Sequence, residues 1–291
     1  MPDIAALVVA PDQLMPRGDA PGVAIEQFAK LCLAQGDSWF TIGGVPPWIT
    51  TNLLSHMVFS EKACIVNCAQ PGKQLMHMVD TLRHRRFLQL LRGRTAHKWH
   101  VILLSGGGND LIDAALSPPT ASRANRLLLT AAEWDAAQPA PARYLSAEGW
   151  LTFVAHLNAV FDQLLIERDK GINATTPVVL HSYDVAVPRN AGAGFGIGPW
   201  LHAAFELYAI PLDDRTELAV ALLNGLRDLL KAMVATRPTA NVWLVDTIGT
   251  LTRALHGDAG ESGDWENEIH PTRGGYGRLA QRWRPEVEAR W

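Results

Sequence analysis

Five short runs of consecutive apolar residues divide the chain, at residues 31–34, 63–66, 101–104, 178–180 and 242–245. None of them alternates between apolar and polar residues, as a strand with one face in water would. Continuous apolar runs of this length are typical of strands that are covered on both faces, as in parallel sheets. The pattern therefore predicts a parallel sheet of about five strands.

Two segments between these runs have apolar residues at the spacing of a helix with one buried face. The positions are Leu157, Val160, Phe161, Leu164 and Leu165 in the first segment, and Leu222, Leu226, Leu229, Leu230 and Met233 in the second. Strands that alternate with helices predict an α/β fold with right-handed crossovers. We expect a three-layer α/β/α sandwich built on a doubly wound parallel sheet.

A length of 291 residues suits one large domain, and we expect residues 1–291 to form a single one. Two connections, at about 116–147 and 185–215, are longer than connections in compact domains usually are. Loops of this length commonly act as lids or binding loops, and we expect these insertions to form a lid. The glycine cluster of the second insertion does not lead from a strand directly into a helix, which argues against a dinucleotide-phosphate loop.

Charge and composition exclude several classes of protein. The 26 basic and 29 acidic residues give a net charge of −3 and form no basic block, so we expect no nucleic-acid partner. The first residues lack the basic region of a signal peptide, and no apolar stretch approaches the roughly 18 residues of a membrane span. The three cysteines form no disulfide framework, and neither they nor the histidines have the spacing of a metal site. We expect a cytoplasmic protein without metal or cofactor.

Polar residues and glycines follow the predicted strands, at the edge of the sheet where open α/β proteins bind ligands. Gly36-Asp37-Ser38 follows the first strand, Gly72 the second, and Gly107-Gly108-Asn109-Asp110 the third. Asn267 and His270 lie downstream of the fifth strand. A serine hydroxyl is a weak nucleophile until a base accepts its proton, and histidine is the natural base near neutral pH. Ser38 and His270 are therefore candidates for nucleophile and base.

These four blocks, in this order, resemble the motifs of the GDSL/SGNH hydrolases, a family of esterases and lipases. The resemblance implies a flavodoxin-like strand order and hydrolysis of a carboxylic ester through an acyl-serine intermediate. It makes Ser38 the nucleophile, supported by Asp37, and His270 the base. It also implies an oxyanion hole made by the backbone N–H groups of Ser38 and Gly72 and the side-chain amide of Asn109.

One position departs from the family pattern, because Asn267 stands where the family usually has an aspartate three residues before the histidine. An amide can orient an imidazole but cannot stabilise an imidazolium with a full charge. Three interpretations are open. The enzyme uses a Ser–His dyad with Asn267 or a backbone carbonyl as the orienting group; a carboxylate nearby, Asp264, Glu266 or Glu268, supplies the charge; or activity is weak. A degenerate family member that binds a ligand without turnover is the alternative function.

The motif residues also have structural interpretations. Ser38 could be a helix N-cap, and Asn109 and Asp110 could cap a helix that starts at Leu111, which is the role we expect for Asp110. Four aromatic residues are candidates for lining a substrate pocket, although core packing is expected for any single one of them. They are Trp39, Phe40, Trp48 and Trp200.

The substrate class is the least determined part of the prediction. A carboxylic ester, a lysophospholipid, a thioester and a sugar acetate all suit the four blocks. The insertion at 185–215 is aromatic and glycine-rich with few charges, which favours a small-molecule ester with an apolar acyl chain. The sequence leaves the oligomeric state open. A flavodoxin-like protein that binds a ligand without catalysis would explain the fold, but not the pairing of Ser38 with His270.

Overall fold

A six-stranded parallel sheet forms the centre of the protein, with the strand order β2-β5-β3-β6-β7-β8. The computed structural model describes residues 3–15, 21–41, 51–80 and 85–291. The strands are β2 (Leu7–Val9), β3 (Lys30–Gly36), β5 (Ala63–Asn67), β6 (Val101–Ser105), β7 (Val178–His181) and β8 (Val242–Val245). The interior strands are buried on both faces, as continuous apolar runs require.

All five predicted strands are present, and their order along the sheet is the flavodoxin-like one. In chain order they are strands 1 to 5, and they lie as 2-1-3-4-5. The sixth strand, β2, was not predicted. It has three residues at the edge of the sheet and Leu7 is 41% exposed, so its apolar pattern is short and weak. A separate antiparallel pair joins β1 (Ile4–Ala5) to β4 (Val58–Phe59).

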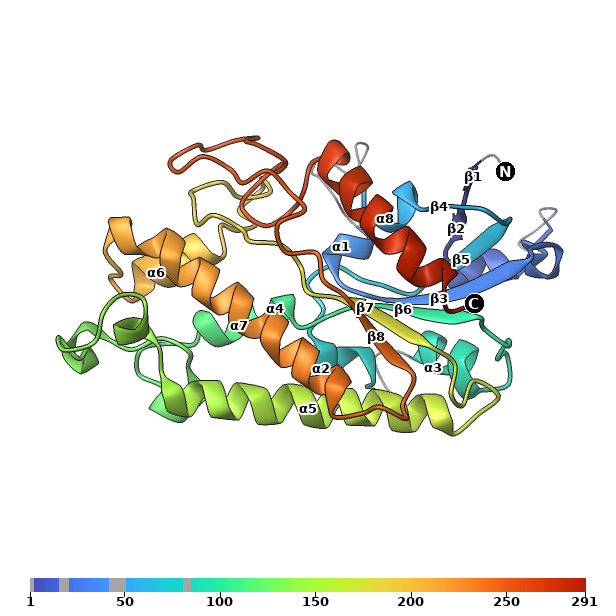
Figure 1. Ribbon diagram of the computed structural model, residues 1–291, viewed down its shortest axis with the longest axis horizontal. Helices are drawn as coiled ribbons and strands as arrows, with labels where there is room; N and C mark the ends of the chain where they lie inside the picture. The colour runs from blue at the N-terminus through green and yellow to red at the C-terminus, as the bar shows by residue number, and fades with distance from the viewer. Residues whose placement is uncertain (1–2, 16–20, 42–50, 81–84) are drawn as a thin grey trace.

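Helices cover both faces of the sheet, which confirms the three-layer sandwich. The helix α8 (Arg273–Glu288) lies on one face, and α3 (Arg85–Arg92), α5 (Ala147–Asp169) and α7 (Arg215–Ala235) lie on the other (Figure 1). The shorter helices are α1 (Ser38–Thr41), α2 (Leu75–Met78), α4 (Gly108–Ala115) and α6 (Leu201–Leu207). Single 3-10 turns occur at Pro11–Leu14, Ile25–Gln27, Leu54–His56, Arg123–Asn125, Ala131–Glu133, Ala142–Tyr144 and Leu212–Asp214.

The predicted apolar faces of the two long helices are turned inward. In α7 all five predicted residues are buried, and in α5 four of them are buried while Val160 is half-buried. Among the described residues, α5 is also the one helix that could cross a membrane by length and composition, with a mean hydropathy of 1.2. A core helix meets the same criterion, so this is weak evidence for a membrane span.

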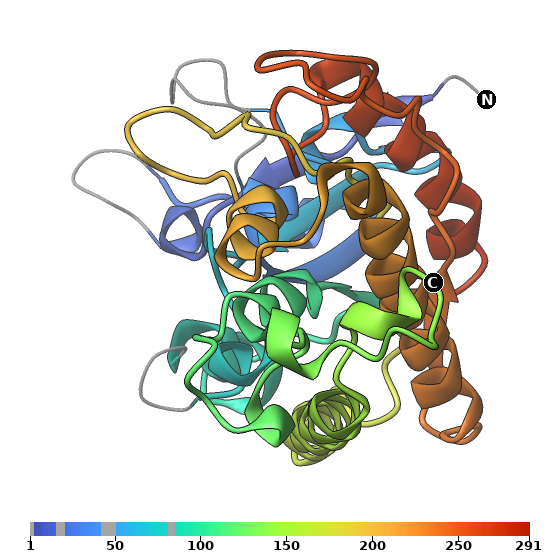
Figure 2. The same ribbon diagram turned by 90° about the vertical axis from the view of Figure 1, so that its left-hand side faces the viewer.

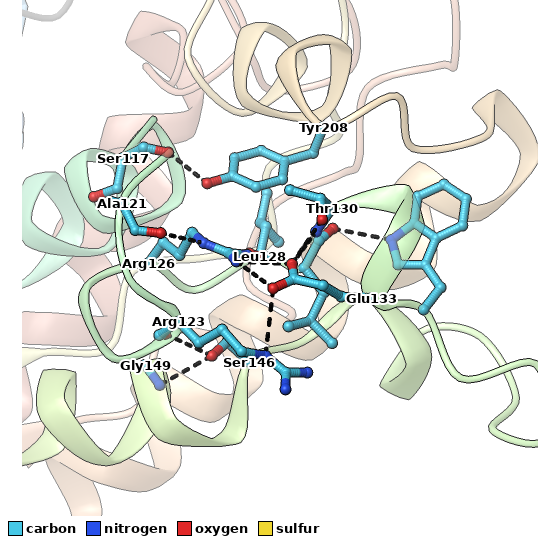
Figure 3. Close-up of polar contacts among 12 residues, drawn as sticks. Ser117, Ala121, Arg123, Arg126, Leu128, Thr130, Glu133, Ser146, Gly149 and Tyr208 are labelled. Atoms are coloured by element: carbon cyan, nitrogen blue, oxygen red, sulfur yellow. Dashed lines mark hydrogen bonds and ion pairs between the residues drawn. The ribbon is translucent and has the colours of Figure 1, made fainter. Parts of the chain in front are cut away.

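Within the first insertion, 116–147, the buried side chain of Arg126 binds three separate positions of the segment (Figure 3). Its guanidinium donates to the carbonyls of Ala121 (3.0 Å) and Leu128 (2.5 Å) and binds both carboxylate oxygens of Glu133 (2.6 and 2.7 Å). Hydrogen bonding to Arg126 lowers the pKa of Glu133 to about 2. A bidentate pair of this kind fixes geometry as well as adding energy.

Both insertions gather at the end of the molecule where the parallel strands finish. Figure 2 looks onto this end and shows the green 116–147 segment, the gold 185–200 segment and the red loop before α8 together. The second insertion contains α6 and continues into α7. The fold therefore places both insertions beside the edge of the sheet where the predicted site residues lie.

Candidate active site

Ser38 is the first residue of α1, immediately after β3. Asp37 caps this turn, because its Oδ1 accepts a hydrogen bond from the backbone N–H of Trp39 (3.0 Å). The interpretation of Ser38 as an N-cap is therefore wrong. Its hydroxyl instead lies 2.8 Å from Nε2 of His270, which is distant in sequence by 232 residues.

His270 is buried in the loop between β8 and α8, and burial lowers its pKa to about 4. The imidazole is therefore neutral at pH 7, the state that can accept a proton. Its ring packs edge-on against Trp200 of the second insertion, with ring centroids 5.3 Å apart. The indole N–H of Trp39 donates to the carbonyl of Ile269 (3.1 Å), which ties α1 to the histidine loop.

Asn267 lies on the other side of the imidazole. Its Oδ1 is 3.0 Å from His270 Nδ1 and also accepts from the backbone N–H groups of His270 (3.0 Å) and Ile269 (3.1 Å). Two backbone donors directed at one atom require that atom to be the amide oxygen. Nδ1 of His270 must then carry the proton, which leaves the lone pair of Nε2 for the hydroxyl of Ser38.

Two of the alternative carboxylates, those of Asp264 and Glu266, have no described contact with the imidazole of His270. Asp264 accepts from the backbone N–H of Thr252 (2.7 Å) and forms an ion pair with Arg278. The side chain of Glu266 is half-buried, and burial raises its pKa, but it is the backbone N–H of this residue that contacts the carbonyl of His270 (2.9 Å). The polar partner on Nδ1 of the histidine is thus an amide.

Glu268, the third alternative, joins the second insertion to the histidine loop. Its buried carboxylate accepts from the backbone N–H groups of His202 (2.6 Å) and Arg189 (3.4 Å), and burial raises its pKa to about 7. The buried guanidinium of Arg189 donates in turn to the carbonyl of Asn267 (2.7 Å). These contacts fasten the segment 185–215 to the loop that carries the histidine.

The predicted oxyanion donors lie on neighbouring loops. Asn109 occupies the first turn of α4, and its amide donates to the carbonyl of Lys73 (3.1 Å). This bond holds the loop of Gly72 beside α4. Gly72 is exposed and has φ of +68°, a conformation that favours glycine. Because α4 begins at Gly108 and its N-cap is Gly107, the expected helix start at Leu111, capped by Asn109 and Asp110, is wrong.

Asp110 is not the N-cap of this helix, contrary to the prediction. It lies within the first turn of α4, and its Oδ2 accepts from the backbone N–H of Leu75 in α2 (2.9 Å). Burial raises the pKa of this carboxyl to about 6. The contact links α4 to α2, the helix that follows the loop of Gly72, so Asp110 has a positioning role.

A buried hydrogen-bond chain beneath the serine was not predicted. The backbone N–H of Tyr183 donates to His181 Nδ1 (3.2 Å), so the His181 Nε2–H donates to Ser105 Oγ (2.9 Å). Ser105 Oγ donates to Asp37 Oδ1 (2.8 Å), and the Tyr183 hydroxyl donates to Asp37 Oδ2 (2.5 Å). Burial raises the pKa of Asp37 to about 6 and lowers that of His181 to about 3. The chain fixes the aspartate that caps the turn carrying Ser38.

A narrow pocket of about 40 Å³ opens at Ser38 and Asn109. The rest of its wall includes aromatic residues and aliphatic residues from α4, α6 and α7. These are Trp39, Tyr183, Trp265, Leu111, Ile112, Ala186, Leu201, Leu223 and Ile269. Of the predicted aromatic residues, Trp39 lines the pocket, Trp200 contacts His270, Phe40 is a core residue, and Trp48 lies outside the described residues.

No protein-family model matches the sequence, and no curated protein is similar to it. Solved structures do resemble the fold. The extracellular lipase of Streptomyces rimosus is 15% identical, with a TM-score of 0.51 over 90% of this chain and 100% of that one. The lipase Lip_vut3 from a goat rumen metagenome is 14% identical, with a TM-score of 0.51 over 89% of this chain and 97% of that one. The chain therefore has the fold of SGNH-type hydrolases.

Proposed function

We propose that the protein is a serine esterase that hydrolyses carboxylic esters of small molecules. The observation that carries this proposal is the 2.8 Å contact between Ser38 Oγ and Nε2 of a neutral His270. Two residues far apart in the chain meet at the carboxyl edge of the sheet, within the distance that proton transfer requires. The two solved structures of the same fold are lipases, which agrees with chemistry at an ester.

The reaction proceeds in two acyl-transfer steps. Nε2 of His270 accepts the hydroxyl proton as Ser38 Oγ bonds to the ester carbonyl carbon. The tetrahedral intermediate collapses when its bond to the alcohol oxygen breaks, and the imidazolium returns the proton to the departing alcohol. Water then attacks the acyl-serine with the same histidine as base, which releases the carboxylic acid and regenerates Ser38.

We assign the third position to Asn267, which gives a Ser–His–Asn arrangement. Replacement of an aspartate by asparagine is damaging where the amide imposes the wrong histidine tautomer. Here two backbone N–H groups orient the amide oxygen toward His270, so the productive tautomer is kept. What the site lacks is the charge that would stabilise an imidazolium.

The oxyanion would be held by the backbone N–H groups of Ser38 and Gly72 and by the amide of Asn109. A side-chain amide has two hydrogens. One hydrogen of Asn109 bonds the carbonyl of Lys73, and the other, which has no partner among the described residues, would bond the negative oxygen. Asn109 shares the pocket wall with Ser38, as an oxyanion donor must.

The test is steady-state hydrolysis of p-nitrophenyl acetate by the wild type, Ser38→Ala and His270→Ala. We expect both variants to fold and to lose activity by at least about a thousandfold, since they remove the nucleophile and its base. Ser55→Ala is the matched control, because Ser55 is exposed and bonds only to its own turn in the contacts described. Folded wild type without activity would favour the degenerate, ligand-binding alternative.

A further inference from the structure

The pocket at Ser38 is partly open to solvent, and its interior is small. Its volume is about 40 Å³. An apolar cavity of about 150 Å³ binds benzene, which corresponds to roughly 25 Å³ for each carbon atom. A pocket of this size therefore accommodates one or two carbon atoms.

The composition of the wall favours hydrocarbon. Ile112 from α4, Leu201 from α6 and Leu223 from α7 are all at least nine-tenths buried and line the pocket together with Ala186. Asp37 and Asp184 also line the pocket, but their carboxylates already accept hydrogen bonds from within the protein. Such a pocket stabilises an alkyl group by desolvation and offers little to the polar hydroxyls of a sugar or glycerol moiety.

The position of His270 decides which part of the ester enters this pocket. The alcohol oxygen must face Nε2 of His270 to receive its proton. Among the described residues the pocket wall includes Ser38 and Asn109 but excludes His270. The group that enters the pocket is therefore the acyl chain, and the alcohol is directed away from it, toward the side of the histidine.

We propose that the enzyme is selective for short acyl groups, acetyl and propionyl, with Leu223 and Ala186 setting the limit. This inference rests on the proposed esterase function and narrows its substrate class. It sets a limit on the length of the apolar acyl chain that the composition of the 185–215 insertion favours. The apolar residues of that insertion that reach the pocket, Ala186 and Leu201, shorten it.

The first measurement is kcat/KM of the wild type for p-nitrophenyl acetate, propionate, butyrate, hexanoate and octanoate. One methylene more than a hydrophobic pocket can hold typically costs about tenfold or more in kcat/KM. We expect a fall of at least about tenfold between propionate and hexanoate. Equal or higher kcat/KM for octanoate than for acetate would overturn the proposal.

Two variants test the assigned residues in opposite directions. Leu223→Ala removes three carbon atoms from the wall and should move the fall by two or three carbons toward longer chains. Ala186→Val adds two carbons to the wall and should lower kcat/KM for propionate relative to acetate by about tenfold. Leu230→Ala is the matched control, because Leu230 is a buried leucine of the same helix outside the pocket wall.

The outcomes separate this inference from the proposed function. Folded wild type that hydrolyses none of the esters refutes the esterase function, and the acyl preference with it. Hydrolysis with a flat chain-length profile refutes the acyl preference alone. A profile that shifts equally in Leu223→Ala and Leu230→Ala contradicts the role of Leu223. Should Leu223→Ala lose its near-UV circular dichroism, the profiles of the wild type and Ala186→Val decide the matter.

Discussion

Replacing Asn267 with aspartate restores the charge that the site lacks. The amide oxygen receives three hydrogen bonds at 3.0–3.1 Å, from the backbone of Ile269 and from the backbone and ring of His270. A carboxylate oxygen would receive the same three, so its charge would be stabilised although the position is buried. The variant replaces the amide NH2 group with an oxygen atom and nearly keeps the volume of the side chain.

The size of the effect follows from the position of the new charge. Burial lowers the pKa of His270 to about 4 in the wild type. An opposite charge in contact raises such a pKa by roughly 1–3 units. Since the neutral imidazole is the active base, activity is lost as the pH falls through this pKa. The acid limb of kcat/KM should move from near pH 4 to between about pH 5 and 7. At pH 8 we expect kcat to rise on the order of tenfold, because a stronger base contributes more to proton transfer.

The assay is kcat/KM for p-nitrophenyl acetate from pH 3.5 to 9, with circular dichroism at each end. Asn158→Asp is the control, because it adds the same charge on α5, where the Asn158 amide oxygen bonds Arg237. It should leave the acid limb in place. An unchanged acid limb and rate in folded Asn267→Asp would refute the contact of this side chain with the histidine, and would favour a dyad or another carboxylate.

Three further predictions concern other parts of the site and its supports. Asn109→Ala should lower kcat by roughly a hundredfold with KM changed far less, because an oxyanion donor acts in the transition state; an effect confined to KM would refute the role. Tyr183→Phe removes the hydrogen bond to Asp37 (2.5 Å). It should lower the unfolding free energy, measured by urea titration, by about 1–3 kcal/mol, and should also lower kcat. Wild-type values of both would show that this bond contributes to neither stability nor activity. Arg126→Met removes both bonds to Glu133 and leaves the carbonyls of Ala121 and Leu128 without this donor, so it should lower the unfolding free energy by about 1–3 kcal/mol. Arg123→Met, at a side chain 47% exposed, should cost less than about 1 kcal/mol. Equal losses in the two variants would contradict the structural role of Arg126.

The sheet was predictable because its strands are covered on both faces and so leave continuous apolar runs. Both ends of each run lie within two residues of the ends of an observed strand. The buried faces of α5 and α7 follow the predicted spacing of apolar residues. β2 was missed because it has only three residues at a partly exposed edge of the sheet, too few to form a recognisable apolar run. The start of α4 was misplaced because Gly107, with φ of +102°, is the N-cap, and glycine gives no side-chain capping signal.

The predicted pairing of Ser38 with His270 rests on short motifs after strands, and the structure brings the two together. The supporting residues carry no such signal. Ser105 and His181 are the last residues of β6 and β7, and a polar residue ending a buried strand is the one sequence feature that marks them. Arg189 could not be found, because its partners are backbone carbonyls about 70 to 80 residues away.

The most direct test of the central claim is labelling of the folded protein with a fluorophosphonate, followed by mass spectrometry of the labelled peptide. A serine activated by a neighbouring base reacts with this probe, and an ordinary serine does not. The account predicts one label per chain, on Ser38, and no label in Ser38→Ala. Folded wild type that takes up no label, or a label that persists in Ser38→Ala, would contradict it.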